Sequence, residues 1–289
     1  MTKTSSFVRL MRRTPLGEKI YLTIGYSILV AWALITLFPL YWMVTTAIKP
    51  PTFVMALPPE WIPRELTFEN FVEMFAKRPW VRWSVNSVIV AGGVTLFQLV
   101  TASMAGYGFS KKEFPGREFI FWLYISSMMI PGFALIIPLY QLAVKLRLRD
   151  TYLGIMMPGL SSSFGTFLMR QFIRTLPTEL IDAGKIDGCG ELSVFWRIVM
   201  PLALPGMAVL GIFVFMGQWG SFLWPLIVTS KDRMKVITLA VGTLGTAELR
   251  TNYGAVMAGS TYIALPMFLV FAFFSRYFLR GVTIGALKG

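Results

Sequence analysis

Residue types that perform chemistry are scarce in this chain. It contains no histidine and a single cysteine, Cys189. Histidine is the commonest general base and metal ligand, so the Cys189 thiol lacks its ordinary activating partner. We therefore expect no catalytic residue and no metal site. We interpret Cys189 as a structural residue at a helix turn.

The composition is that of a membrane protein. Of the 289 residues, 55% are hydrophobic and 14% are charged, whereas a soluble domain carries about 25% charged residues. The net charge of +13 could suggest nucleic acid as a partner. However, the cations lie in short segments between apolar runs, where they would meet lipid headgroups. We expect membrane lipid as a partner and no nucleic acid.

The apolar runs predict an all-α integral membrane protein with about six transmembrane helices. A helix needs about 20 apolar residues to cross a bilayer core. Six runs approach or exceed that length: Tyr21–Ala47, Ser84–Phe109, Phe119–Tyr140, Tyr152–Met169, Met207–Thr229 and Tyr253–Ser275. The fourth run is the shortest, and Pro158 and several glycines interrupt it. We keep it as a span because its small residues suit close contact between helices.

The six runs contain no Asp, Glu, Lys or Arg. Ion-coupled carriers and intramembrane hydrolases place ionisable groups inside the membrane, so this absence argues against both. The polar and aromatic candidates for a solute path are Asn86, Gln98, Gln218, Trp219, Trp224 and Tyr262. Bridging or packing between helices explains these side chains at least as well. The chain also lacks a G-x-x-x-x-G-K-[ST] phosphate loop, so energy for uphill transport would enter through a partner.

The orientation follows from the positive residues. An even number of spans places both termini on one side. The N-terminal cations Lys3, Arg9, Arg12, Arg13 and Lys19 favour the cytoplasm. On this topology 15 of the 27 Lys and Arg residues are internal, so the N-terminal cluster decides the prediction.

One predicted internal segment, residues 176–205, has the pattern of a helix, a glycine turn and a second helix. Pro177 suits a first helical position, and acidic residues follow in the opening turns. Gly188 and Gly190 can end that helix. A second short helix is expected over Glu191–Met200, and prolines 201 and 205 would mark the return to the membrane.

This segment resembles the EAA loop of ABC importer permeases. The family pattern is Glu-Ala-Ala, three residues, Gly, nine residues, Ile, one residue and Leu-Pro. The matching residues are Ala183, Gly188, Ile198 and Pro201, while Asp182, Gly184 and Met200 replace Glu, Ala and Leu. The family's usual Asp-Gly-Ala reads Asp187-Gly188-Cys189.

Other segments resemble the carbohydrate-uptake branch, particularly the smaller permease of maltose-type transporters. They are Phe38–Met43, Thr166–Phe172, Trp219–Pro225 and Arg280–Gly289. Within Trp219–Pro225, Gly220 and Ser221 stand where the family usually has Asn followed by an acidic residue.

The resemblance implies a type I ABC importer transmembrane domain, which is a transport subunit and not an enzyme. Residues 1–20 would form a cytoplasmic N-terminus, and residues 21–289 the permease domain with its coupling loop at 176–205. The residues expected to couple to an ATPase are Glu179, Asp182, Ala183, Gly184, Asp187, Gly188 and Pro201. In the family, the corresponding loop docks into a groove of the cytoplasmic ATPase.

The implied partners are a second permease, an ABC ATPase dimer and an extracytoplasmic solute-binding protein. ATP and Mg would bind the ATPase, and no cofactor would bind this chain. The implied location is the plasma membrane of a bacterium or archaeon, with several spans and both termini cytoplasmic. The implied solute is a sugar or oligosaccharide, and glycerol phosphate also fits this branch.

Two alternatives remain for the function: a secondary carrier or channel without an ATPase, and, less favoured, a membrane scaffold. The segment Ser230–Asn252 is external on this topology, and the polar stretch Thr246–Gly254, which overlaps its end, is expected to reach a solute-binding protein. The alternative is an ordinary connection.

Overall fold

The computed structural model describes residues 16–50, 58–248 and 253–286, and the described part is helical without strands. The first elements are α2 (Leu16–Ala47), α3 (Glu69–Lys77) and α4 (Trp80–Lys111). The middle of the chain holds α5 (Arg117–Ser126), η1 (Ser127–Met129), η2 (Gly132–Leu135), α6 (Ile136–Lys145), α7 (Tyr152–Met156), η3 (Met157–Gly159) and α8 (Ser163–Arg174). The predicted coupling loop contains α9 (Thr178–Ile186), α10 (Glu191–Val194), η4 (Phe195–Val199) and α11 (Met200–Leu202). The last elements are α12 (Leu204–Trp219), α13 (Leu223–Val228), η5 (Asp232–Met234), α14 (Ile237–Glu248) and α15 (Tyr253–Ala286).

Three of the six predicted spans are single helices in the described residues. They contain Lys19–Ala47, Trp80–Lys111 and Tyr253–Phe273, each long and apolar enough to cross a membrane. Two helix pairs reach that length only together. The pair Arg117–Met129 and Gly132–Lys145 bends by 90°, and the pair Glu191–Leu202 and Leu204–Trp219 bends by 77°. Counting each bent pair as one span gives five candidates, one fewer than predicted.

The prediction of one continuous span over Tyr152–Met169 is wrong. This run is divided among α7, η3 and α8, of which α8 is the longest with 12 residues. Pro158 stands within the break, and proline cannot donate the backbone hydrogen bond that would continue a helix. Ser162 then caps α8 by accepting a hydrogen bond of 2.9 Å from the Gly165 amide.

The chain divides into two compact units. The first contains α2, the chain as far as Val72 and the beginning of α15. Within it the buried Asn70 side chain donates to the carbonyls of Ala47 and Lys49, at 2.9 and 2.7 Å. These bonds satisfy carbonyls at the end of α2 that have no partner within the helix.

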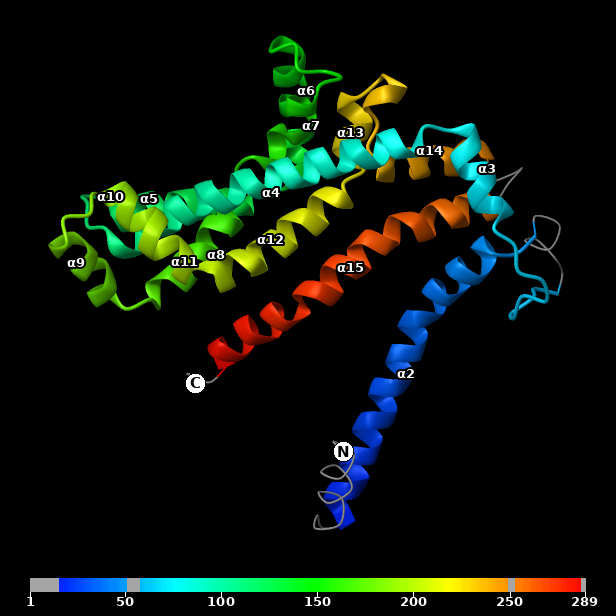
Figure 1. Cartoon of the computed structure of the whole chain (residues 1–289), viewed down its shortest axis with the longest axis horizontal. Coiled ribbons are helices and arrows are strands. Elements are labelled where there is room, and N and C mark those ends of the chain that lie inside the picture. Colours follow the sequence, from blue (N-terminus) through cyan, green and yellow to red (C-terminus); the bar gives the residue numbers. More distant parts are fainter. Residues whose placement is uncertain (1–15, 51–57, 249–252, 287–289) are drawn as a thin grey trace. The chain divides into compact units, whose positions relative to one another are not determined.

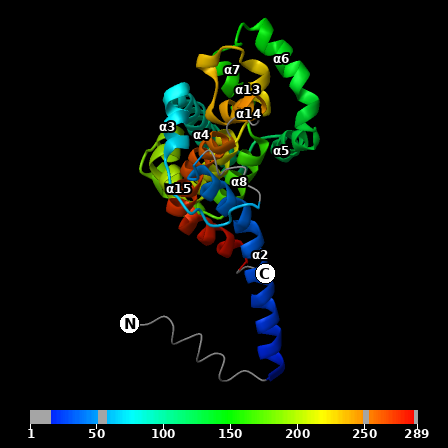
Figure 2. The same cartoon turned by 90° about the vertical axis from the view of Figure 1, so that its right-hand side faces the viewer.

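The second unit contains the predicted coupling loop. Its longest helix, α4, packs against α7, α8, α12 and α14. Figure 1 shows α9, α10 and α11 at one end of α4, with α13 and α14 at the other. Figure 2 shows the sharp turn of the chain between α5 and α6.

Two groups of buried apolar residues stabilise the ends of this unit. The group near the coupling loop contains Ala102, Tyr107, Met169, Ile173, Ile181, Val194, Phe195, Val199, Ala203 and Leu210. The group at the far end contains Val90, Ala143, Ile155, Val228, Met234, Val236 and Leu239. Each group joins side chains that are distant in the sequence, so each fixes loops onto the helices.

Candidate functional site

The predicted coupling helix forms as α9. Pro177 directly precedes it with a φ of −59°, a value that leads into a helix, and Glu179 lies in the first turn. Glu179 and Asp182 are exposed, and Lys185 forms an ion pair with Asp182 at 3.9 Å. The polar face of α9 is therefore available for contact with a partner.

Gly188 ends α9 in the way the sequence predicts. Its φ of +81° is in the left-handed region, where a side chain is strained and glycine is not. The Gly188 amide donates to the Lys185 carbonyl, and the Cys189 amide donates to the Gly184 carbonyl, both at 3.0 Å. This pair of bonds is a Schellman motif. Gly188 thereby sets the direction in which the chain leaves α9.

Gly184 explains one departure from the EAA pattern. It is buried, and a Cβ placed there would lie 2.4 Å from Cδ1 of Ile198. The family's alanine would therefore need Ile198 to move. Because Ile198 is the isoleucine of the same pattern, the two positions form one contact between α9 and η4.

The second half of the loop is helical over Glu191–Leu202, close to the short helix predicted over Glu191–Met200. The chain forms α10, then a five-residue π-helix (η4), then α11, which includes Pro201. Pro201 and Pro205 lie in the first turns of α11 and α12. The bend of 77° falls between them, at Ala203. That these prolines mark the return to the membrane stays a prediction.

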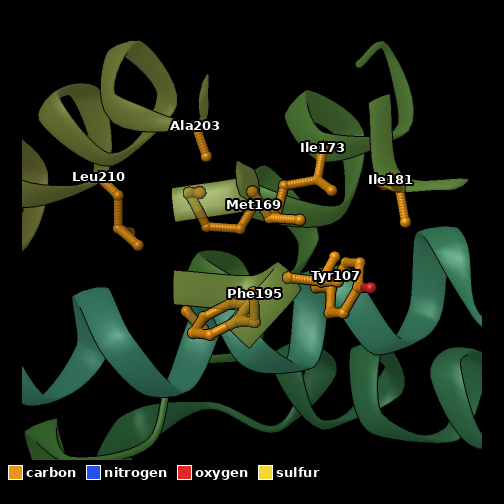
Figure 3. Packing of buried hydrophobic residues seen from close by; sticks show 10 residues of the cluster. Tyr107, Met169, Ile173, Ile181, Phe195, Ala203 and Leu210 are labelled. Carbon is orange, nitrogen blue, oxygen red and sulfur yellow. The ribbon is translucent and has the colours of Figure 1, made fainter. Parts of the chain in front are cut away.

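Apolar side chains attach this loop to the helices. Ile181 of α9 and Phe195 of η4 are buried beside Ile173 of α8 and Tyr107 of α4 (Figure 3). The ring centroids of Tyr107 and Phe195 are 5.9 Å apart. Ile181 marks the buried face of α9. Residues outside this face are exposed, including Leu180, Ile186 and Asp187. Ala183 is exposed as well. The loop therefore has one anchored face and one free face.

Asn86 bridges segments at the far end of the second unit. Its amide nitrogen donates to the carbonyls of Arg233 and Lys235, at 2.9 and 2.8 Å. Its oxygen accepts a 2.7 Å bond from the Tyr152 hydroxyl. The side chain is 1% exposed and fully used by these bonds, which fits the bridging alternative of the sequence analysis.

Gln98 and Gln218 both lie against Gly159 in η3. The Gln98 amide nitrogen donates to the Gly159 carbonyl. A Cβ at Gly159 would lie 2.6 Å from Nε2 of Gln218. The structure thus brings together two of the predicted polar candidates at the break that divides the fourth run.

A cavity of about 420 Å³ opens beside Gln98. Its walls carry the hydroxyl groups of Thr101, Tyr124, Ser161, Ser162 and Thr166. The Gln98 carbonyl oxygen is buried and has no hydrogen-bond partner among the described residues. A buried acceptor without a partner is costly, and because this oxygen is buried it is not accessible from the cavity.

The three aromatic candidates have structural partners. The indole nitrogen of Trp219 donates to Ile263 O at 3.2 Å, and that of Trp224 donates to Gly154 O at 3.0 Å. Tyr262 shares a 3.0 Å hydrogen bond with Ser84 and packs edge-on against Trp80. The structure does not gather these rings around one site.

The external segment also differs from the expectation of a polar loop. Ile237–Glu248 is the helix α14, so the predicted contact stretch begins inside a helix. Residues 249–252 of that stretch lie outside the described part of the chain.

Sequence reasoning missed two groups of polar contacts. Lys111 and Lys112, at the end of α4, bind the segments on either side of α9. Asp150 accepts hydrogen bonds from the Ser230 and Lys231 amides, at 2.7 and 2.8 Å. The sequence shows two consecutive lysines at the end of an apolar run, but it does not show which groups they bind. No pattern in the sequence indicates the contacts of Asp150.

Comparison with known proteins assigns the chain to a family. The profile of the family described as "Binding-protein-dependent transport system inner membrane component" matches residues 98–284. The chain belongs to this family. It is therefore a membrane component of a transport system and not an enzyme, and the resemblance to ABC importer permeases is confirmed.

Curated relatives extend over nearly the whole chain. The arabinooligosaccharide transport system permease protein AraQ of Halalkalibacterium halodurans is 36% identical over 272 residues, covering 93% of this chain and 96% of that protein. The lactose transport system permease protein LacG of Rhizobium radiobacter is 35% identical over 285 residues, covering 95% and 99%. The alternative of a carrier without an ATPase gains no support from these relatives.

A solved structure confirms the fold. A chain of a bacterial ABC transporter involved in the import of the acidic polysaccharide alginate superposes with a TM-score of 0.82 at 18% identity. The match covers 92% of this chain and 99% of that chain. The all-α fold of a type I importer permease is thus confirmed.

Proposed function

We propose that this chain is a permease subunit of an ATP-driven importer for a sugar or oligosaccharide, and that α9 couples it to an ATPase. The observation that carries the proposal is the combination of a free polar face on α9 with a Gly188 turn that fixes its direction. Closure of the ATPase would move α9 and shift the helices between inward- and outward-facing states. ATP and Mg would bind the ATPase.

The proposed complex contains a second permease, two ABC ATPase subunits and an extracytoplasmic solute-binding protein. The family description supports the last partner, since it names systems that depend on a binding protein. The coupling residues are Glu179, Asp182, Ala183, Gly184, Asp187, Gly188 and Pro201. Residues 1–20 are assigned to a cytoplasmic N-terminus and residues 21–289 to the permease domain.

The sugar assignment has two supports. The curated relatives AraQ and LacG are transport proteins for arabinooligosaccharides and lactose by name. The cavity beside Gln98 is lined in part by hydroxyl groups, which suit a polyhydroxylated solute. The solute contact is tested by Gln98→Leu, which should raise KM for uptake, with Thr95→Val on the same helix as the matched control.

The complex itself is tested by isolating the tagged chain in a gentle detergent and identifying the bound proteins by mass spectrometry. Recovery of an ABC ATPase and a second multi-span permease supports the proposal. Asp182→Arg on the free face of α9 should release the ATPase and leave the second permease bound. Recovery of the chain alone, under conditions that preserve known importers, would contradict the proposal.

The orientation is tested with Ile186→Cys in a Cys189→Ser background. Ile186 is 86% exposed, so its thiol would be open to reagent, whereas Cys189 is half-buried. A membrane-impermeant thiol reagent should label inside-out vesicles after the ATPase is stripped, and should spare right-side-out vesicles. Labelling from the outside alone would overturn the cytoplasmic placement of α9.

A further inference from the structure

The first of two consecutive lysines at the end of α4 binds the chain that enters α9. The Lys111 ammonium donates to the carbonyls of Leu176 and Arg174, at 2.5 and 3.4 Å. It also donates to the Thr178 hydroxyl at 3.0 Å. Arg174 is the last residue of α8, Leu176 lies in the connection, and Thr178 is the first residue of α9. A cation suits this place because carbonyls at a helix C-terminus carry partial negative charge.

The second lysine binds the chain that leaves α9. Lys112 forms an ion pair with Glu191, the first residue of α10. The same carboxylate oxygen accepts a 3.4 Å bond from the Tyr107 hydroxyl, and the Lys112 ammonium lies 4.9 Å from the centroid of the Tyr107 ring. Lys112 and Tyr107 of the α4 segment therefore meet at one acidic group.

These contacts hold both ends of α9 at the same end of α4. Between them, α9 is anchored by the buried Ile181 and by the contact of Gly184 with Ile198. A displacement of α9 cannot leave α4 unaffected unless both lysine contacts break. Because α4 packs against α7, α8, α12 and α14, movement of its end reaches most of the unit.

We propose that Lys111 and Lys112 are positioning residues that transmit the movement of α9 to α4. This inference rests on the proposed coupling role of α9. The side chains of Lys112 and Glu191 are 27% and 60% exposed, and exposed ion pairs contribute little to stability. Loss of the pair should therefore affect coupling more than folding.

The test uses the complete complex, isolated as above and reconstituted in liposomes with its solute-binding protein. Solute import and ATP hydrolysis are measured together, and their ratio reports coupling. Lys112→Glu should lower this ratio by about fivefold or more, the lower end of coupling between protein sites. The charge exchange Lys112→Glu with Glu191→Lys should restore the ratio. Lys111→Met should lower it as well, and Lys111→Arg should retain most of it, since arginine can donate to the same carbonyls.

Lys145, an exposed lysine at the end of α6, supplies the matched control. Lys145→Glu should leave the ratio unchanged. The inference is overturned if Lys112→Glu couples normally, or if the charge exchange fails to restore coupling in complexes that assemble and hydrolyse ATP at the wild-type rate. Failure of the wild-type complex to import solute with ATP would instead reject the proposed function.

Discussion

The two ends of the second unit each contain a buried apolar group, but they differ in the polar contacts that attach their loops. At the coupling end, loops are attached by lysines and a glutamate that retain partial exposure. At the far end, they are attached by the buried Asn86 amide and by Ser87, whose hydroxyl accepts a 2.7 Å bond from the Ile237 amide. Exposed charged contacts rearrange at small cost, whereas buried neutral bonds are costly to break. The difference predicts that losing a polar contact at the coupling end affects coupling more than stability, and that losing one at the far end affects stability more than coupling.

The largest expected effect comes from Gly188→Glu at the coupling end. The substitution forces a side chain into a positive φ and adds charge beside the free face of α9. We expect transport to be abolished while the protein remains in the membrane, as measured by uptake and by immunoblotting of membranes. Gly190→Ala is the matched control, because Gly190 has a φ of −68° and open space around its Cβ position. Normal transport by Gly188→Glu at normal expression would reject the coupling assignment.

Asn86→Leu, at the far end, should lower the stability of the protein and leave coupling intact. It leaves the Lys235 carbonyl and the Tyr152 hydroxyl without this partner, while the Arg233 carbonyl keeps its bond from Arg82. The free energy of unfolding should therefore fall by about 1–3 kcal/mol. Thermal unfolding in detergent measures this loss, and Thr95→Val provides the control because the Thr95 hydroxyl bonds only within its own helix. If stability is unchanged but coupling fails, the contrast between the two ends is wrong.

Gly184→Ala should have a smaller effect. The new methyl group would meet Cδ1 of Ile198, the end of a flexible side chain, so we expect about 1 kcal/mol of destabilisation and slower transport. Adding Ile198→Val removes the conflicting atom and should restore both properties. Without such recovery, the contact between α9 and η4 would not explain the glycine.

The smallest expected effect is on the thermal stability of the protein in acid, and it involves Asp150 at the far end. Burial raises the pKa of Asp150, but hydrogen bonds from the Lys231 and Ser230 amides outweigh it and hold this pKa below its ordinary value of 3.8. A lowered folded-state pKa stabilises the protein above the unfolded value, and this contribution disappears as pH falls through the folded value. Thermal stability should therefore decline less in acid for Asp150→Asn, which also tolerates the local φ of +56°. An identical acid response in both proteins would contradict this account.

Much of the membrane architecture follows from composition and run length. Apolar runs such as Tyr21–Ala47 predicted helices because no other short segment satisfies its backbone inside lipid. The sequence did not predict that the helices break at Pro131 and Pro158, because proline inside an apolar run can either bend a helix or end it. Gly188 was predicted correctly because glycine has a local conformational reason to end a helix.

The sequence by itself determined the membrane class, the positions of most helices and the glycine turn after α9, because these depend on local hydrophobicity and backbone preference. Only the tertiary structure decided which polar side chains meet. Lys112 lies 79 residues from Glu191, and Gln98 lies 61 residues from Gly159. No local pattern encodes such pairs, because packing of distant helices determines which side chains become neighbours.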